Sequence, residues 1–130
     1  MIIKKYELKK IEKNNYKFFL FYGKNNGFKD EVINDFFLKN FDGTIIRYDE
    51  QEFISNFEVV ATEIMTKSLF DSKKILIISR VSDKISKYIE EINNREINDI
   101  SIILKSGILE KRSKLRSLFE KNNKLITIPF

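Results

Sequence analysis

The sequence contains no cysteine and no histidine, and very little glycine or proline. Without Cys and His, disulfide bonds, zinc sites of the Cys/His type and catalysis by either side chain are excluded. Only 4 Gly and 1 Pro occur in 130 residues, and no linker, low-complexity tract or internal repeat divides them. We therefore expect residues 1–130 to form one domain around one core, without a bound metal.

Long apolar segments are also missing. No run approaches the roughly 20 residues that cross a bilayer. Residues 1–10 mix isoleucine with four lysines and do not form a signal peptide. We therefore expect a cytoplasmic protein that does not bind membranes.

The chain carries more basic than acidic residues, 24 Lys and Arg against 19 Asp and Glu, for a net charge of +5. This excess suits an anionic partner such as nucleic acid, an acidic protein surface or a membrane face. A composition rich in Lys, Asn and Ile, as low-GC genomes encode, would explain the charge equally well. The charge alone does not identify a partner.

Five short apolar runs are typical of buried strands, because they are rich in Ile and Phe and too short for helices. They are Phe18–Tyr22, Thr44–Tyr48, Lys74–Ser79, Ser101–Leu104 and Leu125–Ile128. A helical pattern separates each run from the next. This alternation predicts an α/β fold, with a five-stranded parallel sheet between two helical layers in a three-layer αβα arrangement.

The helical patterns consist of apolar residues spaced three or four apart. The first helix, of about three turns, is expected to follow Asp30 and Glu31, whose charges suit the positive end of a helix dipole. The four apolar sets are Ile33, Phe36, Phe37 and Phe41; Phe53, Phe57, Val60 and Ile64; Ile85, Tyr88, Ile89 and Ile92; and Leu115, Leu118 and Phe119. The second set forms the clearest stripe and predicts a helix with one buried face.

The loop Gly23–Asp30 follows the first strand, and ligands of open parallel sheets bind beyond the carboxyl ends of strands. A phosphate-binding loop has the pattern G-x-x-x-x-G-K-[ST], in which amides and the Lys hold phosphates and the hydroxyl holds magnesium. Here Gly23 and Gly27 are one residue too close, Phe28 separates Gly27 from Lys29, and Asp30 replaces the hydroxyl. The loop is therefore a degenerate version of this pattern.

The third strand also lacks the acids that position magnesium in ATPases, since it ends in Ser79 and Arg80. We therefore expect a plain strand-to-helix turn, with no nucleotide, no other cofactor and no catalytic site. A receiver domain is excluded as well. Tyr22, Ser79 and Pro129 stand where its acidic cluster, phosphorylated Asp and Lys would be.

Leu69 and Phe70 are out of phase with the stripe that ends at Ile64. At about 100° per residue, a continuing helix would place Leu69 almost opposite the stripe and Phe70 well to one side. Polar residues at 66–68 and 71–74 flank the pair. An apolar tip rimmed by polar residues is a candidate anchor for a pocket of a partner protein, but this pattern alone does not decide whether the pair is exposed. The alternative is that the chain turns and packs the pair under the edge of the sheet.

Two segments then resemble a known family. Ser68–Lys74 (SLFDSKK) enters an aliphatic strand, and Leu109–Leu115 (LEKRSKL) opens the next helix. As an ordered pair, together with the strand into Tyr22-Gly23 and the degenerate loop, they resemble the delta subunits of the bacterial DNA polymerase III clamp loader. The resemblance runs through the whole chain.

This resemblance implies an AAA+-like domain, related to the P-loop NTPases, that lacks a functional nucleotide site and has its first strand central in the sheet. It implies that Leu69 and Phe70 insert into a hydrophobic pocket of the beta sliding clamp. There they would help to open the ring for loading onto primed DNA in replication. The chain would be a non-catalytic subunit of the polymerase holoenzyme.

Subunits of this family are longer and continue into a lid domain and a helical collar domain that assembles with gamma or tau and delta prime subunits. We therefore expect residues 1–130 to be an excised N-terminal domain. Most contacts with those subunits would lie outside it, and its contact with DNA would be indirect.

Basic residues around the last helix are candidates for weak DNA contact. They are Lys111, Arg112 and Lys114, with Arg116, Lys121 and Lys124 nearby. No aromatic residues for base stacking are interleaved with them, so a solvated helix face is the favoured interpretation. Any DNA binding is expected to be weak and sensitive to salt. A diverged P-loop nucleotide-binding enzyme and a nucleic-acid-binding α/β domain are the alternatives to a clamp-binding module.

Overall fold

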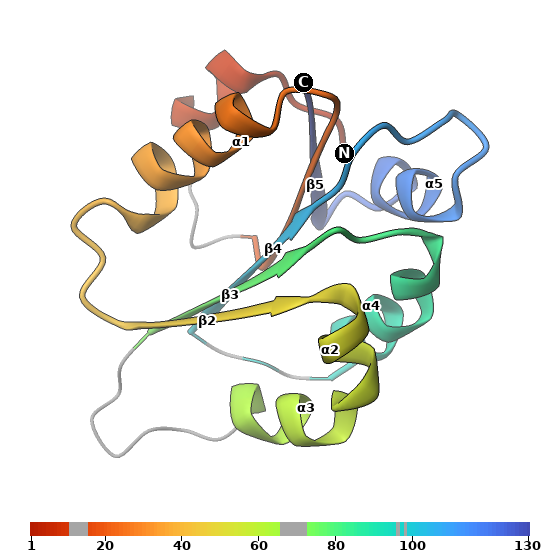
Figure 1. Cartoon of the computed structure of the whole chain (residues 1–130). Coiled ribbons are helices and arrows are strands. Elements are labelled where there is room, and N and C mark those ends of the chain that lie inside the picture. Colours follow the sequence, from red (N-terminus) through yellow and green to blue (C-terminus); the bar gives the residue numbers. More distant parts are fainter. Residues whose placement is uncertain (11–15, 66–72, 96, 98) are drawn as a thin grey trace.

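The centre of the fold is a sheet of five parallel strands in the order β2-β3-β4-β1-β5 (Figure 1). The computed structural model describes residues 1–10, 16–65, 73–95, 97 and 99–130. The strands are β1 (Phe18–Tyr22), β2 (Thr44–Asp49), β3 (Lys74–Ser79), β4 (Ile100–Lys105) and β5 (Leu125–Pro129). All five predicted strands are confirmed, and three of them are slightly longer than expected.

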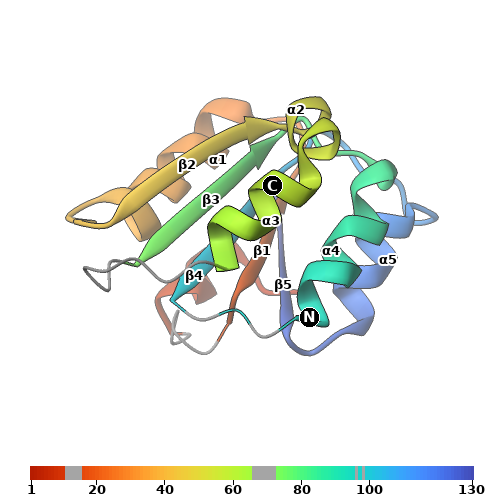
Figure 2. The same ribbon diagram turned by 90° about the horizontal axis from the view of Figure 1, so that it is seen from below.

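Helices cover both faces of the sheet (Figures 1 and 2). They are η1 (Lys5–Lys10), α1 (Asn26–Ile33), η3 (Asn34–Leu38), α2 (Glu50–Ser55), α3 (Phe57–Met65), η4 (Asp83–Ile85), α4 (Ser86–Asn93) and α5 (Lys114–Lys121). One apolar cluster joins the sheet to η1, α1 and η3, and a second joins its other face to α2, α3, α4 and α5. The predicted α/β class, with a parallel sheet flanked by helices, is thus confirmed.

β1 is buried along its whole length because helices cover both of its faces. Phe18 and Leu20 belong to the cluster under α2–α5, whereas Phe19 and Phe21 belong to the cluster under α1. This alternation is the one that successive side chains of a strand must follow. β1 lies inside the sheet between β4 and β5, although β4 rather than β1 occupies the middle position.

The start of α1 differs from the sequence prediction. The helix begins at Asn26, and the side chain of Asn25 caps it by accepting a hydrogen bond from Phe28 N at 2.9 Å. Asp30 and Glu31 therefore lie inside the helix, so the prediction that they mark its start was wrong. A side-chain cap satisfies the free amides of the first turn directly, and here it sets the boundary. The helix continues into η3, and Phe41 lies beyond its end.

The predicted apolar stripe of the second helical region is confirmed. Its residues Phe53, Phe57, Val60 and Ile64 are all buried. Asp49 and Glu52 form a capping box that starts α2, with Glu52 N donating to Asp49 Oδ1 at 2.9 Å and Asp49 N donating to Glu52 Oε1 at 3.1 Å. The stripe extends over two helices because the α-helical run is interrupted at Asn56.

The first residues of the chain extend the sheet beyond β5. Ile3 N donates to Thr127 O at 2.9 Å, Thr127 N donates to Met1 O at 2.8 Å, and Ile2 forms a parallel bridge with Thr127. No sequence pattern predicted this pairing. At the opposite edge, the partner of β2 among the described residues is β3.

The described residues contain neither a membrane-spanning helix nor a metal cluster. Within the described ranges, no helix has both the length and the apolar character that crossing a bilayer requires. The same residues contain no group of three or more acidic side chains placed to hold a metal ion. The expected cytoplasmic location stays a prediction.

Candidate functional site

The loop after β1 lies at the carboxyl edge of the sheet, between the ends of β4 and β5. Gly23 N donates to Gly107 O at 3.0 Å, and Phe130 N donates to Tyr22 O at 2.9 Å. Gly23 has a φ of +131°, and a Cβ atom added there would lie 2.3 Å from Phe130 O. The position requires glycine both for this conformation and for the close approach of the C-terminal backbone.

Lys29 turns its side chain back into this loop and is only 1% exposed. Its ammonium donates to Gly23 O at 2.7 Å and to Ser106 O at 2.5 Å. Burial, helped by the nearby charge of Lys105, lowers the pKa of Lys29, and Asp30 partly opposes this effect. The lysine that a phosphate-binding loop would direct to its ligand is thus bound to the backbone of the protein itself.

The residues around Lys29 are also engaged. Asp30, which stands where a hydroxyl would hold magnesium, forms an ion pair with Lys105. The ring of Phe28 lies edge-on to that of Phe130, with centroids 5.5 Å apart, and the ammonium of Lys5 lies 4.2 Å from the centroid of Phe28. Gly27 lies in the first turn of α1. Lys29 and Asp30 are therefore bound to other parts of the protein, although residues 24–28 of the degenerate loop are exposed.

Carboxylates do occur beside the end of β3, but they come from β2 and α2. Asp49 forms an ion pair with Arg80 at 2.5 Å. A hydrogen bond from the Glu52 amide, with a further one from Arg80, lowers the pKa of Asp49. Glu50 accepts hydrogen bonds from Ser82 N at 2.7 Å and Ser82 Oγ at 2.9 Å. These carboxylates were not predicted, because they lie about 30 residues before Arg80 and Ser82 in the chain and do not directly follow β3.

The basic residues singled out in the sequence divide into two kinds. Lys111, Arg112 and Lys114 are exposed, in the turn before α5 and at its first residue. Arg116 is instead held by Glu120 at 2.7 Å and by Leu109 O at 3.0 Å. Arg116 therefore ties α5 to the preceding loop, while the other three are accessible to a ligand.

Asp83, just before α4, joins this region to the start of α5. Asp83 Oδ1 accepts hydrogen bonds from Ser113 Oγ at 2.6 Å and Leu115 N at 3.1 Å. The Ser113 hydroxyl and then the Leu115 amide lower the pKa of Asp83. Ser113 also caps α5 by accepting a hydrogen bond from Arg116 N at 3.2 Å. These bonds hold the N-terminal end of α5 against η4.

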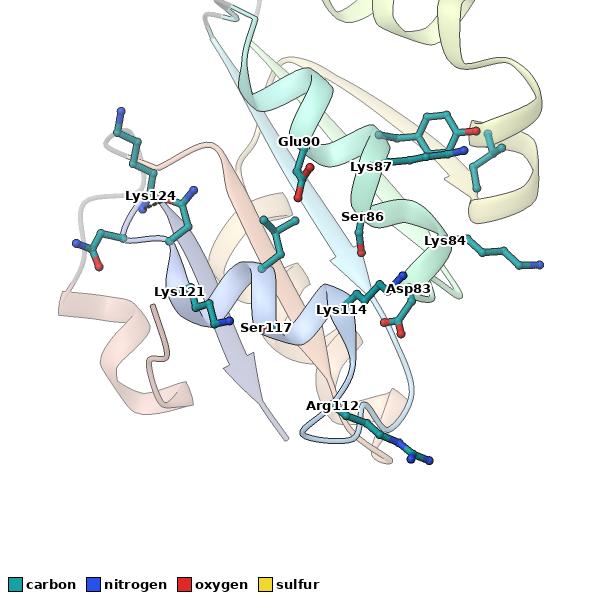
Figure 3. Close-up of a pocket in the computed structure, with 15 residues that line it drawn as sticks. Asp83, Lys84, Ser86, Lys87, Glu90, Arg112, Lys114, Ser117, Lys121 and Lys124 are labelled. Atoms are coloured by element: carbon teal, nitrogen blue, oxygen red, sulfur yellow. Dashed lines mark hydrogen bonds between the residues drawn. The ribbon is translucent and has the colours of Figure 1, made fainter.

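An open groove of about 1180 Å³ is lined by residues of α2, η4, α4 and α5 and of the turns beside α5 (Figure 3). Arg112 and Lys114 line it on one side, and Lys84 and Lys87 line it from η4 and α4. Lys111 is not among its lining residues. Lys84 and Lys87 were not predicted to belong to this basic region, because they are distant along the chain and sequence spacing does not show which helices are neighbours.

Leu69 and Phe70, the predicted clamp-binding residues, lie outside the described residues. Before them, α3 ends at Met65, and after them β3 begins at Lys74. The prediction for this pair thus rests on the sequence. In comparisons with known proteins, no family model and no curated protein matches the chain.

Proposed function

We propose that this chain is the AAA+-like N-terminal domain of a clamp-loader delta subunit. It binds the beta sliding clamp through Leu69 and Phe70, helps to open the ring, and has no catalytic site of its own. Assembly with gamma or tau and delta prime subunits takes place mainly through lid and collar domains that follow this one in the family.

The arrangement of the sheet supports the fold assignment. A parallel sheet in the order β5-β1-β4-β3-β2, with β1 inside the sheet, is compatible with an AAA+-like fold, although β4 takes the middle position. Helices on both faces and a loop after β1 that leads directly into α1 agree with it as well. Because one fold hosts many functions, this agreement supports the domain type and not the partner.

The loop after β1 supports a domain without a nucleotide. Lys29 donates to two carbonyl oxygens and Asp30 pairs with Lys105, so neither side chain is directed toward a phosphate. Arg80 follows β3 where an ATPase has magnesium-binding acids. These contacts do not favour the alternative of a diverged P-loop enzyme.

The observation that carries the clamp-binding proposal is the segment after α3. Among the described residues, the buried face of this helical region ends at Ile64, and Met65 after it is 44% exposed. Leu69 and Phe70 follow within the SLFDSKK segment that resembles the clamp anchor of the family. Two large apolar residues outside the phase of a completed core face are well suited to a partner's pocket.

The proposal is tested by surface plasmon resonance, with purified bacterial beta clamps immobilised and the 130-residue chain in solution. We expect saturable binding with a Kd of about 1 μM or tighter, equivalent to about −8 kcal/mol. A panel of clamps from several low-GC bacteria controls for species differences. Absence of saturable binding to every clamp at about 100 μM chain, equivalent to a binding free energy weaker than about −5.5 kcal/mol, would show the proposal to be wrong.

A further inference from the structure

The strand β2 forms an outer edge of the sheet (Figures 1 and 2). It contains no proline and no glycine, and its strand partner among the described residues is β3. The edge at β5 differs, because Ile2 and Ile3 of the same chain pair with Thr127. An uncovered edge offers backbone donors and acceptors to another strand. Within the described part of the chain, β2 is therefore the open edge of the sheet.

The ladder between β2 and β3 shows which backbone groups of β2 face outward. Thr44 N donates to Lys73 O at 3.0 Å, so the backbone of Thr44 faces β3. In a parallel ladder, alternate residues of a strand direct their N–H and C=O groups to the same neighbour. Ile46 therefore also faces β3. Ile45 and Arg47 present their N–H and C=O groups to the open side.

The side chains along β2 leave this edge accessible. Ile46 and Tyr48 pack on the core cluster that contains α2 and α3. Ile45 and Arg47 lie on the other face of the strand, where Ile45 is 39% exposed and Arg47 is exposed as well. Of the two residues with outward backbone groups, one is apolar and one is charged. The charge of Arg47 therefore limits the registers in which a second strand can pair.

We propose that β2 pairs antiparallel with β2 of a second copy of this chain, around a two-fold axis at Ile46. In this register, Ile45 of each copy lies opposite Arg47 of the other. These are two hydrogen-bonded pairs, and each exchanges both of its N–H···O bonds. The aliphatic stem of Arg47 covers the exposed Ile45 side chain across the pair. An axis at Arg47 would instead place two like charges directly opposite each other.

A second copy fits this edge because the edge is complementary to itself. Each outward donor meets an outward acceptor, and Ile46 meets its own counterpart on the face of α2 and α3. Residues 1–3 cover the edge at β5, so each copy brings one open edge and the pair closes both. Two five-stranded sheets then form one continuous sheet. The contact shares no residue with Leu69 and Phe70, so it does not depend on the proposed clamp binding.

The first test is sedimentation velocity of the 130-residue chain at increasing concentration. We expect a monomer–dimer equilibrium with a Kd of about 100 μM or tighter. Ile45→Lys places a second cation opposite Arg47 at both symmetric contacts, and should weaken the dimer about tenfold or more. Ile45→Glu, its matched control, places an anion there and should keep the Kd within about threefold of the wild type. Circular dichroism and thermal melting confirm that each variant is folded.

The second test uses the absence of cysteine from the chain. Ile46→Cys places two thiols across a non-hydrogen-bonded pair, with Cα atoms about 4.5 Å apart, a separation that a disulfide can span. Thr44→Cys, the matched control on the same face of β2, places them about 13 Å apart along the strands. With oxidised glutathione, Ile46→Cys should form a covalent dimer on a non-reducing gel, and Thr44→Cys should not.

Three results would overturn the proposal. The first is a chain that sediments as a monomer at about 1 mM. The second is a dimer that Ile46→Cys does not trap, or that Thr44→Cys traps as readily. The third is an equal effect of Ile45→Lys and Ile45→Glu on the Kd, because Ile45 would then not lie opposite Arg47. A monomeric chain whose binding to the immobilised clamp is weakened by Ile45→Lys would assign the edge to the clamp, and would also overturn the pairing.

Discussion

Lys29 carries a buried ammonium group that is hydrogen-bonded to two carbonyl oxygens rather than to a carboxylate. Such a group stabilises the loop by satisfying two backbone acceptors from segments far apart in the chain. It also carries the desolvation penalty of a buried charge, which lowers its pKa. These opposing effects make the contribution of Lys29 to folding depend on pH.

We expect the stability contributed by Lys29 to increase as the pH rises toward 10.5. Because the pKa is lower in the folded state than its ordinary value of 10.5, the unfolded chain holds this proton longer, and the free energy of unfolding rises with pH between the two values. Urea unfolding of the wild type and of Lys29→Met from pH 7 to 10.5 measures the effect. The free energy of unfolding of the wild type should rise relative to that of Lys29→Met as the pH increases.

The variant Lys29→Met should remain folded. Two unsatisfied carbonyls cost about 1–3 kcal/mol each, against a typical domain stability of about 5–15 kcal/mol. Lys24→Met, which removes an exposed amine from the same loop, controls for the change in net charge. A difference between wild type and Lys29→Met that stays constant with pH would contradict this prediction.

Leu69 and Phe70 are expected to be the anchors of clamp binding. Burying a side chain of this size contributes about 1.5–3 kcal/mol, and removing a central anchor typically costs about 2 kcal/mol or more. Leu69→Ala combined with Phe70→Ala should therefore weaken clamp binding by about two orders of magnitude. Surface plasmon resonance against the immobilised clamp measures the change.

The matched control is Val59→Ala with Met65→Ala, which removes two exposed apolar side chains from α3. This variant should bind the clamp with a Kd within about threefold of the wild type, a change of less than about 0.7 kcal/mol. If the Leu69 and Phe70 variant melts several degrees lower while its folded fraction binds normally, the pair belongs to the core and not to a binding site.

At the scale of elements, α3 depends on its buried face. Phe57 is 7% exposed, and its ring contacts Phe53 at 5.6 Å and Tyr88 at 4.9 Å between centroids. Phe57→Ala should lower the free energy of unfolding by about 3–5 kcal/mol because it leaves a cavity. Val59→Ala, on the exposed face of the same helix, should change it by less than about 0.5 kcal/mol. Chemical denaturation checks both values, and equal losses would mean that the burial of this face does not govern stability.

The start of α5 depends on Asp83, which lies outside that helix. Asp83→Asn should lower the free energy of unfolding at pH 7 by about 0.5–1 kcal/mol, since a capping contact near solvent is lost or weakened. Because hydrogen bonds hold the pKa of Asp83 below its ordinary value of 3.8, its contribution is complete above that pH and is lost as the pH falls through the lower, folded-state pKa.

This pH dependence is checked by denaturation of both proteins between pH 7 and pH 2. The difference in the free energy of unfolding between wild type and Asp83→Asn should be constant above about pH 5, where the carboxylate is ionised in both the folded and the unfolded chain. This difference should shrink on acidification. Ser117→Ala, which alters a partly buried hydroxyl later in α5, serves as the control. A difference that grows as the pH falls would rule out Asp83 as an anionic cap.

At the scale of the whole molecule, the sheet brings together the loop after β1, the turn after β4 and Phe130 after β5, and their backbones hydrogen-bond to one another. We expect no binding of ATP in the presence of magnesium. Lys29 is held by Gly23 O and Ser106 O, and Arg80 rather than an acid follows β3. Isothermal titration calorimetry should give no heat of binding, with a functional P-loop ATPase as positive control. A Kd in the low micromolar range, a binding free energy near −8 kcal/mol, would contradict it.

Local patterns were sufficient to locate most secondary structure. The strands were predicted closely because short Ile- and Phe-rich runs covered on both faces leave little alternative to a buried parallel strand. The stripe from Phe53 to Ile64 was predicted because helical periodicity repeats over several turns. The start of α1 was not predicted correctly. The charges of Asp30 and Glu31 suit the positive end of a helix dipole, but the helix in fact starts where the Asn25 side chain accepts one local hydrogen bond.

The degenerate spacing of Gly23, Gly27 and Lys29 is a property of the sequence, and so is the placement of Leu69 and Phe70 outside the phase of the stripe. Only the tertiary structure directs Lys29 to Ser106, 77 residues away, and brings Asp83 of η4 to the start of α5. Periodicity and turn chemistry act over a few neighbouring residues, so they specify elements. Which elements meet depends on the order of the strands and on the burial of both faces of the sheet, which involve the whole chain at once.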